Sequence, residues 1–227
     1  DVHHGESRGM PHGRGAMTYA RGDIYVGQWI DGAISGAGAM VYASGKVYYG
    51  AWVNGKPHGT GKMRYANGDG RLNGSVYNGE WANGKRHGRG KMRYANGVVY
   101  DGQWADGKPH GRGVMTSDDI FVYDGEWADG KRHGSGTMQY EDGALHEGQW
   151  VEGKRSGHGK FTIPNGNVYD GQWVKDKKSG HGKMTYADNG DRYDGGWHSN
   201  LRHGKGKMHF PGGDIGFDGW YFVYPTG

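Results

Sequence analysis

The sequence predicts an all-β protein, an elongated single-sheet antiparallel β-meander built from tandem repeats. One observation is the spacing of the nine tryptophans, which recur mostly every 23 residues. Fixed self-similarity at such a period is typical of a repeat array. The second is a two-residue apolar alternation inside each repeat, and the third is a Gly-containing turn after each alternating run. The tryptophans are Trp29, Trp52, Trp81, Trp104, Trp127, Trp150, Trp173, Trp197 and Trp220.

Residues 77–81 show the first strand of a repeat. Tyr77, Gly79 and Trp81 alternate with polar residues, which is the period of a strand with one buried face. Asn83-Gly84 follows, and this pair favours a tight hairpin because both residues tolerate positive φ.

Residues 88–94 show the second strand, in which Gly, Gly, Met and Tyr alternate with Arg, Lys and Arg. Asn96-Gly97 then turns the chain into the next repeat. Each repeat therefore has two strands and two turns, and parallel pairing is excluded because it needs long crossovers. The small glycines beside tryptophan predict that each Trp ring lies flat over a neighbouring glycine backbone. The residue eleven after Trp is apolar in eight repeats: Met40, Met63, Met92, Met115, Met138, Phe161, Met184 and Met208.

The array is expected to span residues 1–227 as one domain. We expect a degenerate first repeat in 1–24, eight full repeats in 25–216 and a partial C-terminal repeat in 217–227. Residues 69–74 are an insertion, interpreted either as a tolerated loop or as a partner-contact loop. Because residue 1 is Asp and the first repeat is incomplete, we expect the chain to be a fragment of a longer protein.

The composition limits the possible classes. Hydrophobic residues make up 33% of the chain and 49 residues are glycine, so stability should come from stacking of neighbouring repeats. The absence of cysteine excludes disulfides and thiolate chemistry. No apolar run is long enough to predict a membrane span, and no signal peptide is visible, so a cytoplasmic location is the expectation.

Residues 100–113, YDGQWADGKPHGRG, resemble the MORN repeat (membrane occupation and recognition nexus). The shared pattern is Tyr-x-Gly-x-Trp, then Gly-Lys, then His-Gly-x-Gly, and it covers nearly the whole chain. Since no second domain is visible, the chain looks most similar to the repeat-only cytoskeletal scaffold MORN proteins of protists. The resemblance implies scaffolding, self-association through terminal repeats and affinity for phospholipids.

No catalytic, cofactor or metal site is predicted. Equivalent histidines in adjacent repeats would lie about 10 Å apart, whereas zinc needs nitrogen ligands about 2.1 Å from one ion. Each Gly-x-Gly precedes a strand rather than a helix, which argues against a phosphate-binding loop. The methionine column is interpreted as face packing. The histidines of the His-Gly pairs are His12, His58, His87, His110, His133 and His203.

A row of basic residues recurs in the same turn of successive repeats, although the net charge is only +4. It is interpreted as a solubilising turn or as an edge that binds an anionic partner, either a phospholipid head group or an acidic protein. Nucleic acid is not expected, because base stacking needs exposed aromatic residues and these are committed to packing. The predicted anionic-ligand edge is Lys85, Arg86, Lys131, Arg132, Lys154 and Arg155.

The C-terminal residues are rich in aromatic side chains, where a repeat array needs a polar cap. A twofold axis would pair this edge with itself, so a tail-to-tail homodimer is predicted, with a folded-back aromatic cap as the alternative. The predicted interface is Phe217, Trp220, Tyr221, Phe222 and Tyr224.

Together these patterns favour a non-enzymatic structural scaffold. It would self-associate through its C-terminal repeats and organise cytoskeletal or membrane-associated protein assemblies. Its expected partners are itself and cytoskeletal proteins, at a cytoplasmic, cytoskeleton-associated location. A phosphoinositide-binding module at the periphery of a membrane is the alternative function. A third interpretation is an accessory region of an enzyme whose catalytic domain lies outside this chain.

Overall fold

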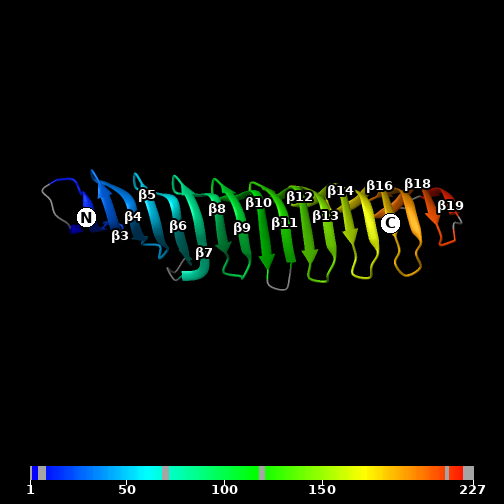
Figure 1. Ribbon diagram of the computed structural model, residues 1–227, viewed down its shortest axis with the longest axis horizontal. Coiled ribbons are helices and arrows are strands. Elements are labelled where there is room, and N and C mark those ends of the chain that lie inside the picture. Colours follow the sequence, from blue (N-terminus) through cyan, green and yellow to red (C-terminus); the bar gives the residue numbers. More distant parts are fainter. Residues whose placement is uncertain (1, 5–8, 68–71, 118–120, 213–214, 222–227) are drawn as a thin grey trace. The chain divides into compact units, whose positions relative to one another are not determined.

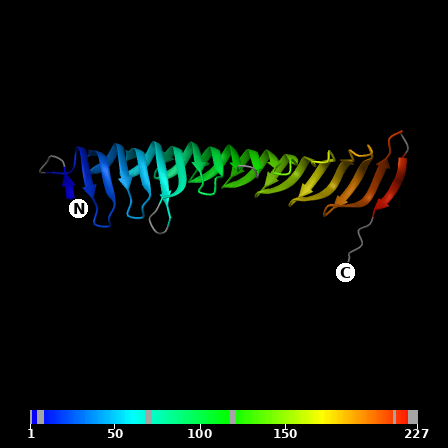
Figure 2. The same cartoon turned by 90° about the horizontal axis from the view of Figure 1, so that it is seen from below.

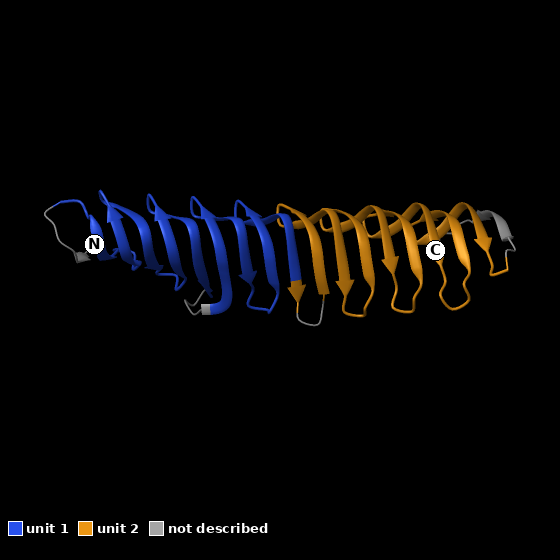
Figure 3. Ribbon diagram, viewed as in Figure 1, with its two compact units in different colours: residues 1–115 blue, residues 116–227 orange. Residues whose placement is uncertain are grey.

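The chain forms strands and turns, as predicted. No helix occurs among the described residues, and so none that could cross a membrane (Figure 1). Contacts divide the chain into two compact units, residues 1–115 and 116–227 (Figure 3). The computed structural model describes residues 2–4, 9–67, 72–117, 121–212 and 215–221, with only the backbone for 2–4, 72 and 215–221.

Unit 1 contains β1 to β9 and most of β10, and its strands follow one another in chain order (Figure 2). Consecutive strands from β1 to β9 pair antiparallel, and β9 also pairs with β10. The strands are β1 (Val2–His4), β2 (Gly13–Thr18), β3 (Ile24–Ile30), β4 (Ala33–Val41), β5 (Val47–Val53), β6 (Lys56–Ala66), β7 (Leu72–Ala82), β8 (Lys85–Arg93), β9 (Val99–Ala105) and β10 (Lys108–Ser117).

Unit 2 repeats the same organisation, and each strand from β11 to β19 pairs antiparallel with the next. The predicted antiparallel meander is therefore confirmed within both units. The strands are β11 (Phe121–Ala128), β12 (Lys131–Tyr140), β13 (Leu145–Val151), β14 (Lys154–Thr162), β15 (Val168–Val174), β16 (Lys177–Thr185), β17 (Arg192–His198), β18 (Leu201–His209) and β19 (Ile215–Tyr221).

The turn that follows each tryptophan from Trp29 to Trp197 is a tight two-residue turn. Asn83 and Gly84 have φ values of 51° and 81°, so both central residues are left-handed, as a type I′ turn requires. Lys175 and Asp176 keep the same conformation without glycine, with φ values of 48° and 69°. The turn geometry is thus retained where the Asn-Gly signal is lost.

The insertion at residues 69–74 lengthens one hairpin. Strands β6 and β7 each have 11 residues, and their pairing extends to Ala66 opposite Leu72. The hairpin therefore grows at the end away from the tight turns. Residues 69–71 of the insertion lie outside the described residues.

A tyrosine ring, rather than a tryptophan ring, covers the paired glycines of the described hairpins, except at Gly148 and Gly159, where His146 takes its place. Gly79 lies directly opposite Gly90, and a Cβ added to Gly90 would be 2.2 Å from the Tyr77 hydroxyl oxygen. That hydroxyl donates a hydrogen bond to the Glu80 carbonyl at 2.9 Å. The prediction that Trp lies flat over glycine was wrong, because the close approach of two glycine backbones fits the end of a Tyr ring.

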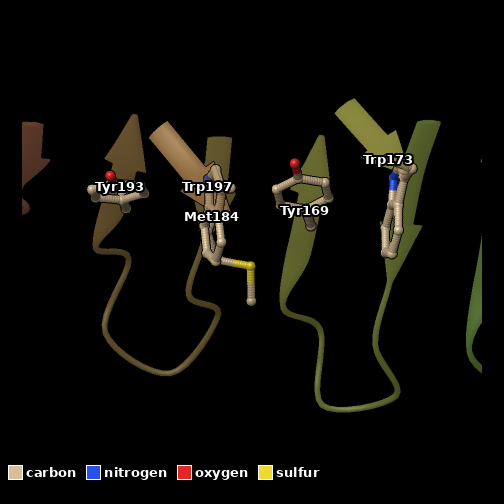
Figure 4. Close-up of a cluster of buried hydrophobic side chains, with 5 residues drawn as sticks. All are labelled: Tyr169, Trp173, Met184, Tyr193 and Trp197. Atoms are coloured by element: carbon tan, nitrogen blue, oxygen red, sulfur yellow. The ribbon is translucent and has the colours of Figure 1, made fainter. Parts of the chain in front are cut away.

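The tryptophan instead joins neighbouring repeats. Trp104 Nε1 donates to the carbonyl oxygen of Gly90 in the preceding hairpin at 2.8 Å. Its ring also meets Tyr77 of the preceding repeat and Tyr100 of its own edge-to-face, at centroid distances of 5.2 and 5.1 Å. Figure 4 shows the same alternation of Tyr and Trp in unit 2. Trp104 is therefore shared between two repeats.

The His-Gly-x-Gly segment has a backbone role. Gly88 has a φ of 55°, which allows the second strand to bend where the register shifts beside Trp81. The carboxylate of Glu80 accepts a hydrogen bond from the Arg89 N–H at 2.9 Å and so holds the bend. The first glycine of the motif thus supplies the bend, and the second, Gly90, makes room for tyrosine.

Replacing Gly90 with Ala tests the tyrosine packing. The new Cβ would overlap the buried Tyr77 ring, and overpacking of this kind costs about 1–3 kcal/mol. The urea midpoint of unfolding should fall clearly. Gly9→Ala is the matched control, because nothing lies within 4 Å of its Cβ position. Equal midpoints for the two variants would contradict the packing described here.

Candidate functional site

The two basic residues that begin strands β8, β12 and β14 have different surroundings. The first is a lysine exposed to solvent: Lys85, Lys131 or Lys154. Lys85 forms an ion pair with Asp106 at 2.9 Å, and Lys131 forms one with Glu152. Exposed pairs of this kind contribute little to stability. These lysines are therefore available to a ligand at low energetic cost.

The second basic residue contacts the next repeat. The Arg132 guanidinium lies 4.4 Å from the ring centroid of Trp150 and donates to the Gly153 carbonyl at 2.9 Å. The Gly153 N–H in turn donates to the Arg132 carbonyl at 2.9 Å. Arg86 stands in the same relation to the following tryptophan and tight turn. Each arginine therefore clamps the turn of the following repeat.

Arg155 shows how far this position is buried. Its side chain is 18% exposed and lies 4.2 Å from the Trp173 ring centroid, with an ion pair to Asp176 at 3.1 Å. Buried Pro57 and Pro109 occupy the same register position in other repeats. The alternation of Arg with Pro was the sequence signal that marks a packing position rather than an exposed edge.

The six predicted edge residues are thus divided by the structure. Lys85, Lys131 and Lys154 face solvent, whereas the three arginines between them serve contacts between repeats. Whether any of the six binds an anion stays a prediction.

The predicted dimer interface lies at the margin of the described chain. Phe217, Trp220 and Tyr221 belong to β19, which pairs with β18, and their side chains are outside the described part. Phe222 and Tyr224 lie outside the described residues altogether. The interface therefore stays a prediction.

Charged side chains of alternating sign form a ladder on the outer face, the side of the sheet opposite the buried Tyr and Trp rings. In unit 2, neighbouring strands place Lys160, Asp170, Lys183 and Asp194 directly opposite one another in turn. Lys183 and Asp194 lie 3.5 Å apart, and in unit 1 Lys91 and Asp101 lie 3.4 Å apart. Cross-strand pairs of opposite charge stabilise a sheet modestly. This ladder was not predicted from the sequence.

Several histidines belong to this polar surface. His181 lies 2.8 Å from Asp194, and His158 lies 3.1 Å from Asp170. Within the described residues, no group of three or more His, Cys, Asp or Glu side chains could hold a metal ion.

One histidine is buried instead. His146 stands where other repeats have the core tyrosine, and its side chain is fully buried between Trp150 and Trp173. Neither of its ring nitrogens has a hydrogen-bond partner. Burial, followed by the nearby charge of Arg155, lowers the pKa of His146 from 6.5 to about 4. The ring is therefore neutral at pH 7.

The residue opposite His146 also differs from that of other repeats. His146 lies opposite Phe161, where the neighbouring repeat has Tyr169 opposite Met184. A smaller ring is thus paired with a larger partner, so the volume of the column is conserved.

A protein-family comparison agrees with this geometry. The MORN repeat model matches residues 7–24, 25–47, 48–70, 77–99, 100–119, 123–145, 146–168, 169–191 and 193–215. The chain belongs to the MORN-repeat family. The Tyr-x-Gly-x-Trp and His-Gly-x-Gly residues of this MORN array are those that form the glycine, tyrosine and tryptophan contacts above.

Other comparisons add less. The search of curated proteins finds no match to this MORN-repeat chain. One similar solved structure is the SAS-4 (dCPAP) TCP domain of Drosophila melanogaster in complex with a proline-rich motif of Ana2 (dSTIL). It is 11% identical and has a TM-score of 0.39, covering 92% of this chain and 90% of that chain. The TCP10c domain of Drosophila melanogaster Sas-4 is 13% identical with a TM-score of 0.34, covering 79% and 96%. Because both TM-scores are low, no functional conclusion follows.

Restoring the usual pair at the buried histidine should stabilise the protein. In His146→Tyr/Phe161→Met the new hydroxyl can donate to the Gln149 carbonyl, as Tyr169 does to Gln172 at 2.9 Å. One such bond contributes about 1 kcal/mol. The urea midpoint at pH 7 should therefore rise.

The same variant should change the dependence of stability on pH. The folded-state pKa of His146 is lower than its unfolded value, so the unfolded chain binds more protons between about pH 6.5 and 4. The stability contribution is complete above pH 6.5 and is lost as the pH falls, by at most about 3 kcal/mol. The double variant should lack this loss, and the control His133→Gln, at an exposed position, should keep it. Parallel pH profiles for all three proteins would contradict the role of His146.

Proposed function

We propose that this MORN array is a non-enzymatic scaffold that binds other proteins along its open sheet. The observation that carries the proposal is that the two faces of the sheet have different roles. The Tyr, Trp and Arg side chains hold neighbouring repeats together, while the outer face presents side chains at a constant spacing that packing does not require. Such a surface suits extended contacts with proteins better than an enclosed reaction site.

The proposal extends to self-association and to the kind of assembly. The aromatic residues near the C-terminus would form a homodimer, and the family resemblance supports cytoskeletal proteins as further partners. The chain would then act at a cytoplasmic, cytoskeleton-associated location. The dimer would place two equivalent outer faces in one particle, which suits a protein that organises assemblies.

Mass measurement tests the self-association. Light scattering with size-exclusion chromatography should give about twice the monomer mass of 24.9 kDa for the intact chain at tens of micromolar. Trp220→Arg/Phe222→Arg should give the monomer mass, since two buried charges oppose the interface. Val174→Arg, at an exposed position on β15, is the control and should remain dimeric. A monomeric intact chain, or a dimeric double variant, would overturn this part of the proposal.

Binding of anionic phospholipids is the second candidate function. The observation that favours it is the exposure of Lys85, Lys131 and Lys154 at equivalent strand starts. Each lysine near an anionic membrane contributes about 1 kcal/mol, so even a few lysines give measurable binding. The flanking arginines would support the turns rather than contact lipid.

Vesicle sedimentation separates the two kinds of basic residue. Lys85→Glu/Lys131→Glu/Lys154→Glu should weaken binding to phosphatidylserine-containing vesicles on the order of 100-fold and leave the urea midpoint nearly unchanged. Arg86→Gln/Arg132→Gln/Arg155→Gln should lower the midpoint, because each change removes a cation–π contact and a hydrogen bond. Binding that is unaffected by the lysine changes, or that also occurs on pure phosphatidylcholine, would remove this candidate.

A further inference from the structure

The charge ladder is interrupted on the outer face of the N-terminal strands. Val26, Ala39 and Tyr49 occupy the repeat position that holds Lys160, Asp170, Lys183 and Asp194 in unit 2, and they lie opposite one another on β3, β4 and β5. The next residue in the column is Lys62, where the charged pattern begins. With Ala16 of β2 opposite Val26, the ladder is therefore replaced by apolar residues over four consecutive strands.

A second apolar row lies beside the first. Ile24 is directly opposite Val41, one pleat away from Val26 and Ala39. Val26 is 55% exposed, Tyr49 51%, and Ile24 and Val41 42% each. We call Ile24, Val26, Ala39, Val41 and Tyr49 the N-terminal outer patch. Contiguous exposure of this kind differs from the scattered single apolar residues of an ordinary surface.

The strands of the patch are apolar on both faces. Tyr25, Met40 and Tyr48 alternate with the patch residues and are buried on the opposite side. A run that is apolar on both sides is typical of a strand covered on both faces. A sheet face with this pattern is normally buried against another layer of secondary structure.

The charges around the patch define the chemistry of what would cover it. Lys62 lies opposite Tyr49 on β6, with Arg64 two residues further along that strand. On the other side, Arg14 of β2 lies opposite Gln28, two residues along from the Ala16 that faces Val26. Strands β2 to β6, as described here, contain no Asp or Glu. A second copy of the same patch would bring like charges together, which disfavours self-pairing. A partner with carboxylates at its margins would complement the patch.

We infer that the N-terminal outer patch binds an amphipathic segment of a partner protein, with apolar side chains over the patch and carboxylates facing Arg14, Lys62 and Arg64. The inference rests on the proposed function as a protein-binding scaffold. A membrane is disfavoured because interfacial surfaces use protruding Trp, Phe and Leu side chains, whereas the patch is built mainly of short Val, Ile and Ala.

The repeat array itself supplies the test variant. Val26→Asp/Ala39→Lys/Tyr49→Asp continues the ladder that Lys160, Asp170 and Lys183 form elsewhere, so this variant should fold with an unchanged or higher urea midpoint. Val174→Asp is the matched control, because Val174 is 56% exposed and lies outside the patch.

The probe is a phage-displayed library of 18-residue amphipathic segments, apolar on one face and randomised among Glu, Gln, Lys and Arg on the other. Segments enriched by the intact chain should be acidic and should bind the triple variant at least about tenfold more weakly than wild type or Val174→Asp. High salt should weaken the interaction further.

No enrichment, enrichment of basic segments, or equal binding to the triple variant would overturn the patch assignment. Loss of phosphatidylserine-vesicle binding in the triple variant, without any selected segment, would assign the patch to a membrane instead. Failure here, with the dimer mass intact, would leave the scaffold proposal standing, whereas acidic segments captured by a monomeric chain would support the patch without self-association.

Discussion

The structure depends on the close approach of two glycines in the hairpins from β3–β4 to β17–β18. Only where Gly79 faces Gly90 without side chains can Tyr77 lie against the backbone and hydrogen-bond to it. Tyr77 then makes an edge-to-face ring contact with Trp104 of the next repeat, and Trp104 donates a hydrogen bond to the Gly90 carbonyl. Neighbouring repeats are therefore held together by contacts that depend on a glycine pair rather than by a thick hydrophobic core.

The fold could be predicted from the sequence because its signals are periodic. The alternation around Trp81 and the Asn83-Gly84 turn are local features, and local geometry determines an antiparallel hairpin. Which ring covers the glycines could not be predicted, since Tyr77 and Trp81 lie on the same face and only the bend at Gly88 separates their roles. That bend depends on the packing of two strands.

The candidate site was less predictable than the fold. Lys131 and Arg132 are adjacent basic residues in the sequence. The pleat of the strand places Lys131 toward solvent and Arg132 against Trp150. The charge ladder could not be predicted from local sequence, because its members are about a dozen residues apart and meet only across strands. The burial of His146 was also not predicted. Its repeat, residues 146–168, matches the family model and differs in the core at His146 and Phe161.

The six-residue insertion shows that the two edges of the sheet tolerate change differently. Trp81 bonds to the Gly61 carbonyl 20 residues before it, whereas Trp52 bonds to Gly38 only 14 residues before it. The same contact survives because the added residues extend the hairpin beyond the Tyr–Gly–Trp layer. The tight-turn edge has less freedom, since the turn backbone bonds to the preceding repeat at Gly55, Gly84, Gly107, Gly153 and Asp176. New loops can therefore be acquired along one edge without shifting the phase of the array, so one margin can diversify while the other stays constant.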